Sequence, residues 1–203
     1  MKWLRRRRRR SRRVALNALL DAALNEGALV GDASRGPRIV VSGPCGVGKT
    51  TIGEALAIEL DAAFLDADSL HPPANVSKMA RGGALDDRDR APWLSACAAA
   101  LAAEAGGCVL ACSALKRTYR AVFDASTVFV LLDVPMAVVL ERVQKREGHF
   151  MPVSLVESQF DTLEAPGDDE GNVFVVDAAR PVDDVVADIL RVAAPGRGPP
   201  PPR

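Results

Sequence analysis

The sequence predicts an α/β domain in which a five-stranded parallel sheet is flanked by helices. Five short segments are apolar and either rich in β-branched residues or bounded by turn residues, and they alternate with segments of helical pattern. The chain of 203 residues is long enough for one well-buried domain and too short for two of ordinary size. The predicted strands are Arg38–Ser42, Ala63–Asp66, Cys108–Ser113, Thr127–Asp133 and Val173–Asp177.

Helices are expected between and after these strands. Proline stands at the predicted first turn of three of them, at Pro92, Pro135 and Pro181, which is a position that proline favours. Buried strands that alternate with helices pair in parallel and place a ligand site at their carboxyl ends. The predicted helices are Lys49–Leu60, Asn75–Arg81, Pro92–Glu104, Lys116–Phe123, Pro135–Arg146, Val153–Leu163 and Pro181–Val192.

The chain divides into three parts by composition. Residues 1–36 form an Arg-rich extension that we expect to be disordered, residues 37–193 form the domain, and residues 194–203 form a disordered Pro-rich tail. The first 13 residues hold 9 of the 26 basic residues and no acid, so residues 14–203 carry 17 basic and 26 acidic residues, a net charge of −9. An acidic body disfavours a nucleic-acid substrate. The extension partly resembles an organelle transit peptide, but a solvated tail or a misassigned start codon is the favoured interpretation.

Cysteine usage and hydropathy bear on the location of the protein. The four cysteines match no zinc-binding pattern, so reduced thiols in a cytoplasmic protein are expected. No stretch approaches the roughly 20 apolar residues of a membrane helix, so no membrane association is expected. Cys45 has two interpretations, a redox-sensitive thiol at a helix N-terminus or a small residue that fills a tight loop.

A glycine-rich loop follows the first predicted strand and precedes the first predicted helix. Its sequence is G-x-x-x-x-G-K-T, and its context is the one that a phosphate-binding loop requires. Lys49 is expected to reach the β- and γ-phosphates of ATP, and the Thr50 hydroxyl to ligate Mg²⁺. The loop therefore predicts nucleotide binding, by the residues Gly43, Pro44, Cys45, Gly46, Val47, Gly48, Lys49, Thr50 and Thr51.

Two carboxylates stand where the second predicted strand ends. Asp66 and Asp68 lie two residues apart, which allows one to bind Mg²⁺ through water and the other to accept a proton from an attacking hydroxyl. We assign to Asp66 the binding of the metal through water, and to Asp68 either the positioning or the deprotonation of the hydroxyl, with His71 nearby. Asp is also common at strand ends and helix caps, so the pair alone is weak support.

Charged residues of both signs follow in two further segments. The mixture around Lys78, Arg81 and residues 86–94 suits an acid that carries several hydroxyl groups, because cations bind its carboxylate and carboxylates accept its hydroxyls. Lys116 and Arg120 are four residues apart and are expected to share one helix face beside the same site. Alternatively, these segments are solvated loops with surface ion pairs.

A basic helix that leads into a glycine-initiated loop, residues 141–152, suggests a lid. Arg142 or Arg146 is expected to stabilise charge on the transferring phosphate, while closure excludes water. His149 is expected either to donate to the substrate or to orient the lid.

Several blocks together resemble the gluconokinase family. Besides the phosphate loop, they are residues 66–72, 75–82, 85–94, 112–120, 148–152 and 158–166, and they cover most of residues 38–192. The resemblance implies a three-layer P-loop kinase fold with a small lid, related to nucleoside-monophosphate and shikimate kinases. It implies transfer of the γ-phosphoryl group of ATP to D-gluconate with Mg²⁺, and a homodimer. Lys49, Asp68, Arg142 and Arg146 are then the catalytic candidates, and the substrate candidates are Asp68, His71, Lys78, Arg81, Lys116, Arg120 and His149.

Three other functions are considered. Another small-molecule kinase, of the shikimate type, is the nearest alternative. A GTPase-like switch requires an Asn-Lys-x-Asp motif, and none of the four Asn residues is followed by Lys. Nucleic-acid binding through the Arg-rich extension predicts salt-sensitive binding that is lost when residues 1–13 are removed.

Overall fold

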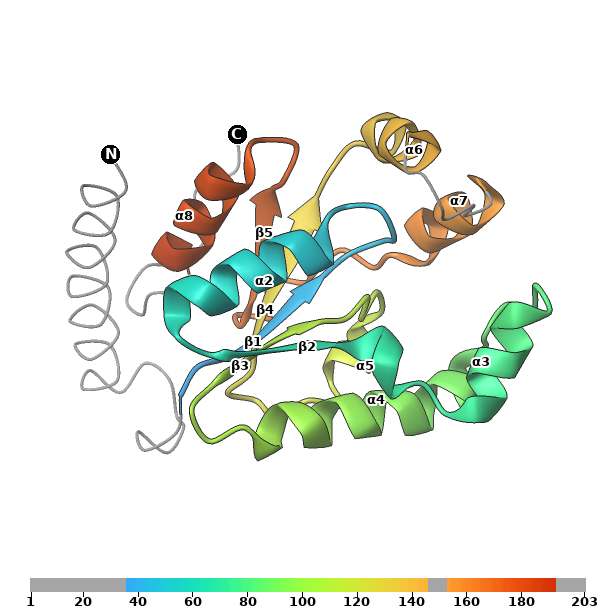
Figure 1. Cartoon of the computed structure of the whole chain (residues 1–203), viewed down its shortest axis with the longest axis horizontal. Helices are drawn as coiled ribbons and strands as arrows, with labels where there is room; N and C mark the ends of the chain where they lie inside the picture. Colours follow the sequence, from blue (N-terminus) through green and yellow to red (C-terminus); the bar gives the residue numbers. More distant parts are fainter. Residues whose placement is uncertain (1–35, 146–152, 193–203) are drawn as a thin grey trace.

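The computed structural model describes residues 36–145 and 153–192. Their arrangement is a parallel sheet between two helical layers (Figure 1). The strands are β1 (Arg38–Ser42), β2 (Ala63–Asp66), β3 (Cys108–Ala111), β4 (Val128–Asp133) and β5 (Val173–Asp177). The helices are α2 (Lys49–Leu60), α3 (Pro73–Ala80), α4 (Asp87–Ala103), α5 (Arg117–Arg120), α6 (Met136–Gln144), α7 (Val153–Thr162) and α8 (Val182–Val192), together with a 3₁₀ turn, η1 (Ala67–Leu70).

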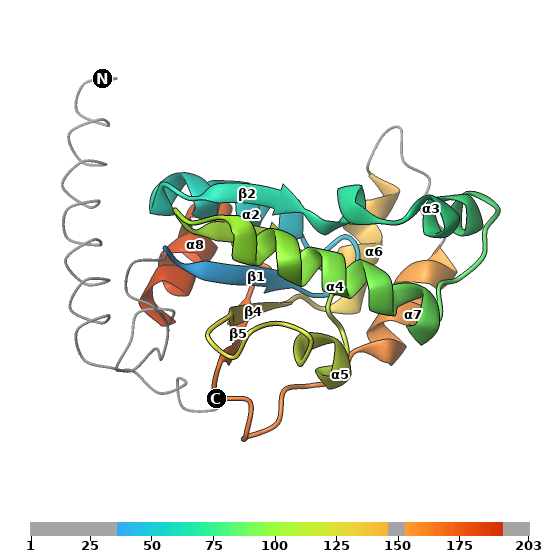
Figure 2. The same cartoon turned by 90° about the horizontal axis from the view of Figure 1, so that it is seen from below.

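The sheet has the order β2-β3-β1-β4-β5, and every neighbouring pair is parallel. In register, Val40 of β1 pairs with Leu110 of β3 and with Phe129 of β4. The predicted fold class is therefore confirmed. Because all strands run in one direction, their carboxyl ends meet at the end of the molecule where α3, α6 and α7 lie (Figures 1 and 2).

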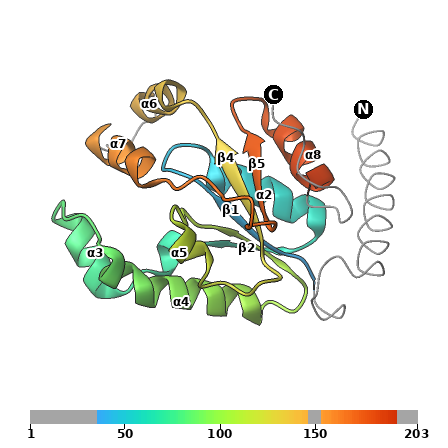
Figure 3. The ribbon, with the colours of Figure 1, turned by 180° about the vertical axis from the view of Figure 1, so that it is seen from behind.

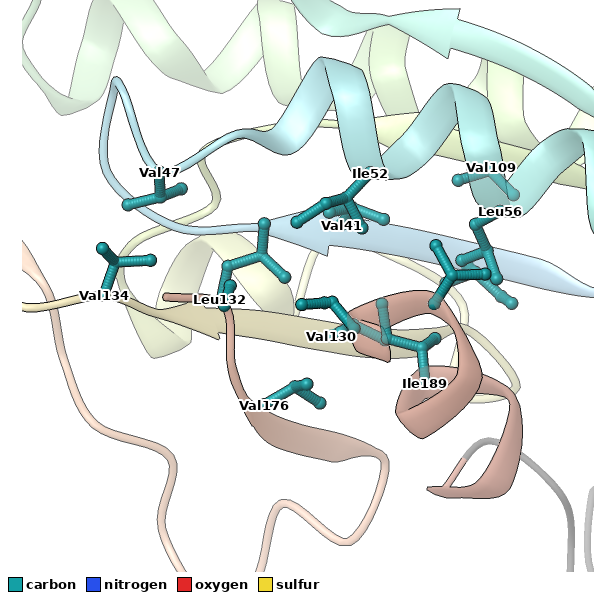
Figure 4. Packing of buried hydrophobic residues seen from close by; sticks show 14 of the residues in the cluster. Val41, Val47, Ile52, Leu56, Val109, Val130, Leu132, Val134, Val176 and Ile189 are labelled. Atoms are coloured by element: carbon teal, nitrogen blue, oxygen red, sulfur yellow. The ribbon is translucent and has the colours of Figure 1, made fainter. Parts of the chain in front are cut away.

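Side chains of β1 alternate between two apolar clusters because successive strand residues point to opposite faces. Ile39 and Val41 belong to the cluster beneath α2 and α8, which Figure 4 shows, and Val40 belongs to the cluster beneath α4. The view from behind shows α4 on the face opposite α2 and α8 (Figure 3). The three central strands are buried except at the end residues Arg38 and Asp133, which explains why their sequences are apolar runs and not alternating patterns.

The largest difference from the sequence prediction is at α4. The helix begins at Asp87, where a capping box joins Asp86 and Asp89, and Pro92 lies inside the helix and not at its first turn. This reciprocal cap marks the start of the helix, because the carboxylate of each of the two residues accepts a hydrogen bond from the backbone N–H of the other. The helix tolerates Pro92 five residues after its start.

The third strand and the segment after it also differ from the prediction. β3 ends at Ala111, although Cys112 N–H still donates to Val41 O at 3.0 Å. Ala114 then takes a positive φ of 38°, a conformation that alanine rarely adopts. The predicted helix Lys116–Phe123 shortens to the single turn of α5.

Among the residues that the structure describes, no helix is both long and apolar enough to cross a membrane.

Candidate functional site

The phosphate loop joins β1 to α2 at the centre of the sheet. Gly43, Gly46 and Gly48 have φ values of 134°, 82° and 104°, which only glycine adopts without strain. Gly43 N–H donates to Ser113 O at 3.2 Å, and this bond fixes the entry of the loop on the segment after β3. Val47 is buried in the cluster of Figure 4, so its side chain anchors the tip of the loop to the core.

Side chains of α6 leave no room for a side chain at Gly46 of the loop. A Cβ at Gly46 would lie 2.7 Å from Val143 and 2.9 Å from Val139, closer than real Cβ contacts. Glycine is therefore required there for packing as well as for its dihedral angle.

Lys49 crosses the loop. Its Nζ donates to Pro44 O at 2.9 Å. Burial lowers the pKa of Lys49, and the nearby Asp68 carboxylate acts in the opposite direction. An anion bound by the loop would therefore compensate the charge of this ammonium better than the carbonyl oxygen does.

The oxygen atoms of Thr50 and Asp66 lie close together and could bind a magnesium ion. The Thr50 hydroxyl lies 3.3 Å from Asp66 Oδ2, and Asp66 Oδ1 accepts from Asp68 N–H at 3.0 Å. Hydroxyl and carboxylate oxygens next to a phosphate loop fit Mg²⁺, which in such sites keeps waters and substrate phosphates as further ligands. No group of three or more His, Cys, Asp or Glu able to hold a metal occurs within residues 36–145 and 153–192.

Asp68 differs from Asp66 in its partners. It is exposed at the first turn of η1, and its carboxylate accepts no hydrogen bond from the described part of the chain. Its charge acts on both Lys49 and His71. Asp68 is thus the carboxylate available to a hydroxyl, while Asp66 caps η1 and faces Thr50.

His71 and Trp93 form a stacked pair beside Asp68. Their ring centroids lie 4.3 Å apart with an interplanar angle of 13°, and Trp93 Nε1 donates to Ala67 O at 2.7 Å. Burial lowers the pKa of His71. Burial therefore favours the neutral form of the imidazole, which stacks on the Trp93 ring.

Lys78 and Lys116 are both in ion pairs with residues at the start of α4. Lys78 Nζ lies 2.5 Å from Asp89 Oδ2, and Lys116 Nζ lies 2.8 Å from Asp87 Oδ1, which also accepts from the Tyr119 hydroxyl. Hydrogen bonds from these partners lower the pKa of Asp87 and of Asp89. The mixed charges that the sequence predicted thus form two clusters at the start of α4, one around Lys78 and one around Lys116, while Arg81 is exposed at the end of α3.

Arg90 lies beside the Lys116 cluster and was not singled out as a candidate from the sequence. Its guanidinium lies 5.8 Å from the centre of the Tyr119 ring and 3.4 Å from the Tyr119 hydroxyl. None of the described carboxylates lies within ion-pair distance of it. The sequence did hold a signal for this residue, because Arg90 is about one helical turn from Asp86 and Asp87 and from Trp93. A run of charged residues, however, does not indicate which of its members binds a ligand.

Arg120 is in a different place from the one expected. It is 5% exposed, and its Nε and Nη2 donate to Glu170 at 2.8 Å each. Its Nη1 also donates to the carbonyls of Leu115 and Glu164. Because Lys116 precedes α5 instead of lying in it, Lys116 and Arg120 do not share a helix face. Arg120 is fully engaged in a buried ion pair, and we therefore leave it out of the substrate-binding set proposed below.

The lid candidates are only partly described. Arg142 donates to Val47 O of the phosphate loop and to Ala178 O after β5, each at 3.4 Å, so it lies between the loop and the half of the sheet formed by β4 and β5. Asp68 follows β2, on the opposite half. Arg146 and His149 lie outside the described residues.

Cys45 is a residue of the phosphate loop that contacts α7. Its side chain is buried, and its backbone N–H donates to Gln159 Oε1 at 2.8 Å. Burial raises the pKa of the Cys45 thiol, an effect that Lys49 opposes only in part. The helix begins at Lys49, four residues later. These facts favour the small-filler interpretation over a reactive thiolate.

Comparison with known proteins identifies the family. The shikimate kinase family model matches residues 45–192. A gluconokinase of Gluconobacter oxydans is 48% identical over 159 residues, which cover 75% of this chain and 89% of that protein. The thermoresistant gluconokinase of Escherichia coli is 39% identical, with 78% and 94% covered.

Solved structures agree with this result. A gluconokinase from Sinorhizobium meliloti is 42% identical, superposes with a TM-score of 0.71, and covers 78% of this chain and 91% of its own. Shikimate kinase from Aquifex aeolicus is 19% identical with a TM-score of 0.56, covering 77% and 95%, and shares the fold. The phosphate loop, the order of the sheet and identity close to one half over most of the chain place this protein in the gluconokinase family of P-loop kinases.

Proposed function

We propose that the protein transfers the γ-phosphoryl group of ATP to the terminal hydroxyl of D-gluconate, forming 6-phosphogluconate and ADP. The observation that carries the proposal is the position of Asp68, whose carboxylate is uncommitted and acts electrostatically on the phosphate-loop lysine. The names of the relatives supply the acceptor, because two gluconokinases match most of the chain.

The donor half of the mechanism follows from the loop. Its backbone N–H groups and Lys49 bind the triphosphate, and Thr50 with Asp66 holds Mg²⁺. When bound, the ion neutralises charge that develops between the β- and γ-phosphates. Lys49 exchanges its Pro44 carbonyl for phosphate oxygen, which is a stronger partner for a buried ammonium.

In the acceptor half, Asp68 accepts the proton of the terminal hydroxyl as its oxygen bonds to the γ-phosphorus. The bond from that phosphorus to the bridging oxygen of ADP breaks, and ADP leaves. Lys78, Arg81, Arg90 and Lys116 bind the carboxylate and the hydroxyls, with His71 beside them. Arg142 or Arg146 in the lid stabilises the charge of the transferring group.

A coupled assay for ADP release tests the proposal. With ATP and Mg²⁺ present, gluconate should stimulate ADP formation, while shikimate and common sugars should not. Stimulation by shikimate alone would support the related kinase activity that the family model raises. Turnover that does not depend on any acceptor would contradict the whole assignment.

Location and assembly are part of the same proposal. All four cysteines are free and buried, which suits a reducing compartment, and we propose a cytoplasmic protein. The homodimer implied by the resemblance stays a prediction, which light scattering coupled to size-exclusion chromatography would check.

A further inference from the structure

Gln159 of α7 accepts a hydrogen bond from the phosphate loop. It lies in one of the blocks that resemble the family, but the proposed mechanism gives it no role. Its Oε1 accepts from Cys45 N–H at 2.8 Å, across 114 residues of sequence. Since a backbone N–H can only donate, the oxygen of the amide must face Cys45, and the NH₂ group is the other end. Among the described residues the NH₂ group has no acceptor, and it is not enclosed.

Cys45 lies at the end of the loop where the γ-phosphate belongs. Lys49 Nζ, which in such loops reaches the β- and γ-phosphates, contacts the carbonyl of Pro44, the residue before Cys45. The Cys45 N–H is therefore next to the position of the lysine head group. A side chain fixed on that N–H is held beside the transferring phosphate.

The far end of α7 is fixed to the acceptor side. After the helix, Glu164 N–H donates to Leu115 O at 2.9 Å, and the Glu164 carboxylate accepts from Arg117 N–H at 2.7 Å. Leu115 and Arg117 flank Lys116, a proposed acceptor-binding residue. Glu164 lies five positions after Gln159, so a short segment of chain connects the Gln159 contact to the residues on either side of Lys116.

We propose that Gln159 is a positioning residue for phosphoryl transfer: its amide oxygen holds the Cys45 N–H, and its amide nitrogen donates to a γ-phosphate oxygen of bound ATP. The inference rests on the ATP-dependent transfer proposed above. A glutamine suits this position because one planar group both accepts from the loop and donates to an anion. A glutamate would keep the first interaction and place negative charge against the phosphate.

The experiment uses the full chain with Gln159→Glu, Gln159→Leu and the control Glu157→Gln, which changes an exposed residue of the same helix. Calorimetry gives the affinities for ATP and ADP, and the coupled assay gives kcat and the KM for gluconate. Thermal unfolding reports the integrity of the fold.

For Gln159→Glu we expect kcat to fall about tenfold or more and the ratio of ATP to ADP affinity to fall by a similar factor, as for loss of a hydrogen bond to a charged group. The KM for gluconate and the Tm should stay as in the unmodified protein. Gln159→Leu should lower kcat with a smaller change of the ratio, because it removes both the amide donor and the amide oxygen but adds no charge. Glu157→Gln should change neither.

An unchanged affinity ratio in Gln159→Glu would overturn the proposal, whatever happens to kcat, because a mere tether of α7 needs only the oxygen. The acceptor assignment is judged separately. If the unmodified protein binds ATP but gluconate does not stimulate ADP release, the proposed substrate fails, while the affinity ratio still decides the role of Gln159.

Discussion

Asp66 and Asp68 are two residues apart and have the same chemistry, yet their surroundings differ in a way that suits the two roles proposed for them. Asp66 caps η1 through Oδ1 and faces the Thr50 hydroxyl through Oδ2. Asp68 is exposed, and none of the described groups donates to its carboxylate. A proton acceptor must have such a free oxygen, whereas a metal ligand gains from being fixed by neighbours.

Replacing Asp68 tests this division directly. We expect Asp68→Asn to lower kcat with gluconate about a hundredfold or more, the usual scale for loss of general-base catalysis, with ATP affinity retained. Steady-state kinetics and calorimetry measure the two quantities. Near-normal turnover in this variant would show that another group takes the proton.

Arg90 is expected to bind the acceptor. Because this arginine has no carboxylate partner among the described residues, Arg90→Ala should raise the KM for gluconate about tenfold, as for loss of a hydrogen bond between charged groups, without changing the KM for ATP. Arg88→Ala is the matched control, since Arg88 is exposed on the same turn of α4. Equal effects of the two substitutions on KM would indicate only a change in overall charge.

Cys45 is expected to resist thiol reagents. Burial raises the pKa of its thiol, so at pH 8 less thiolate is present than in a free cysteine, and access is restricted as well. Brief alkylation followed by mass spectrometry should leave Cys45 unmodified in the folded protein and label it in urea. Oxidative loss of activity that Cys45→Ser prevents would contradict this expectation.

At the scale of elements, the segment after α7 is joined to α5 by two ion pairs of unequal burial. The side chains of Arg120 and Glu170 are 4% and 10% exposed, while Arg117 and Asp169 are both more than half exposed. The inner pair also orders the loop, because Glu170 accepts from Gly167 N–H. The two adjacent carboxylates thus offer a comparison in which mainly burial differs.

Glu170→Gln should lower the free energy of unfolding by about 3 kcal/mol, because it leaves Arg120 buried without a counter-charge. Asp169→Asn should have no measurable effect. Arg120 lowers the pKa of Glu170, so the stabilisation is complete above the ordinary carboxyl pKa of about 4.3 and is lost as the pH falls below it. Urea unfolding at pH 7 and at lower pH measures both effects, and equal stabilities of the two variants would contradict the assignment.

Elements whose signals are local were predictable from sequence, and those set by distant partners were not. The bounds of α2 match the prediction because every signal that sets them is local in sequence: the loop just before the helix, the glycine at its N-cap and the apolar spacing inside it. The start of α4 was wrong because Pro92 is a stronger sequence signal than the cap between Asp86 and Asp89. The partner of Arg120 lies 50 residues away, and no pattern near Arg120 indicates it.

At the scale of the whole molecule, the sites proposed for the two substrates lie after different strands at the same edge of the sheet. The phosphate loop follows the central strand β1, and Asp68 follows the edge strand β2. Between them, β3 leads to Ser113, whose carbonyl holds Gly43, and to Lys116, which pairs with Asp87. The strand order thus places the proposed donor-binding and acceptor-binding residues at the same edge of the sheet. A search for motifs finds each set of residues but not their arrangement in space.

Removing residues 1–13 should leave kcat and the KM for gluconate unchanged, because the family match begins at residue 45. The coupled assay compares the two chains. If the full chain binds nucleic acid, that binding should weaken with added salt and disappear in the shortened chain. Loss of kinase activity on shortening would show instead that the extension contributes to catalysis.

The helix α3 stands away from the rest of the fold, at the end of the molecule beyond α4 (Figures 1 and 2). Asn75 is its only buried residue, and its links to α4 are polar, through Asn75 and Lys78 to Asp89. Local opening of a segment held in this way costs less free energy than opening the sheet. Amide hydrogens of α3 should therefore exchange with deuterium sooner than those of β1 and β4. An acceptor that binds Lys78 would add a contact to this weakly held helix, so gluconate should slow exchange in α3 more than ATP does.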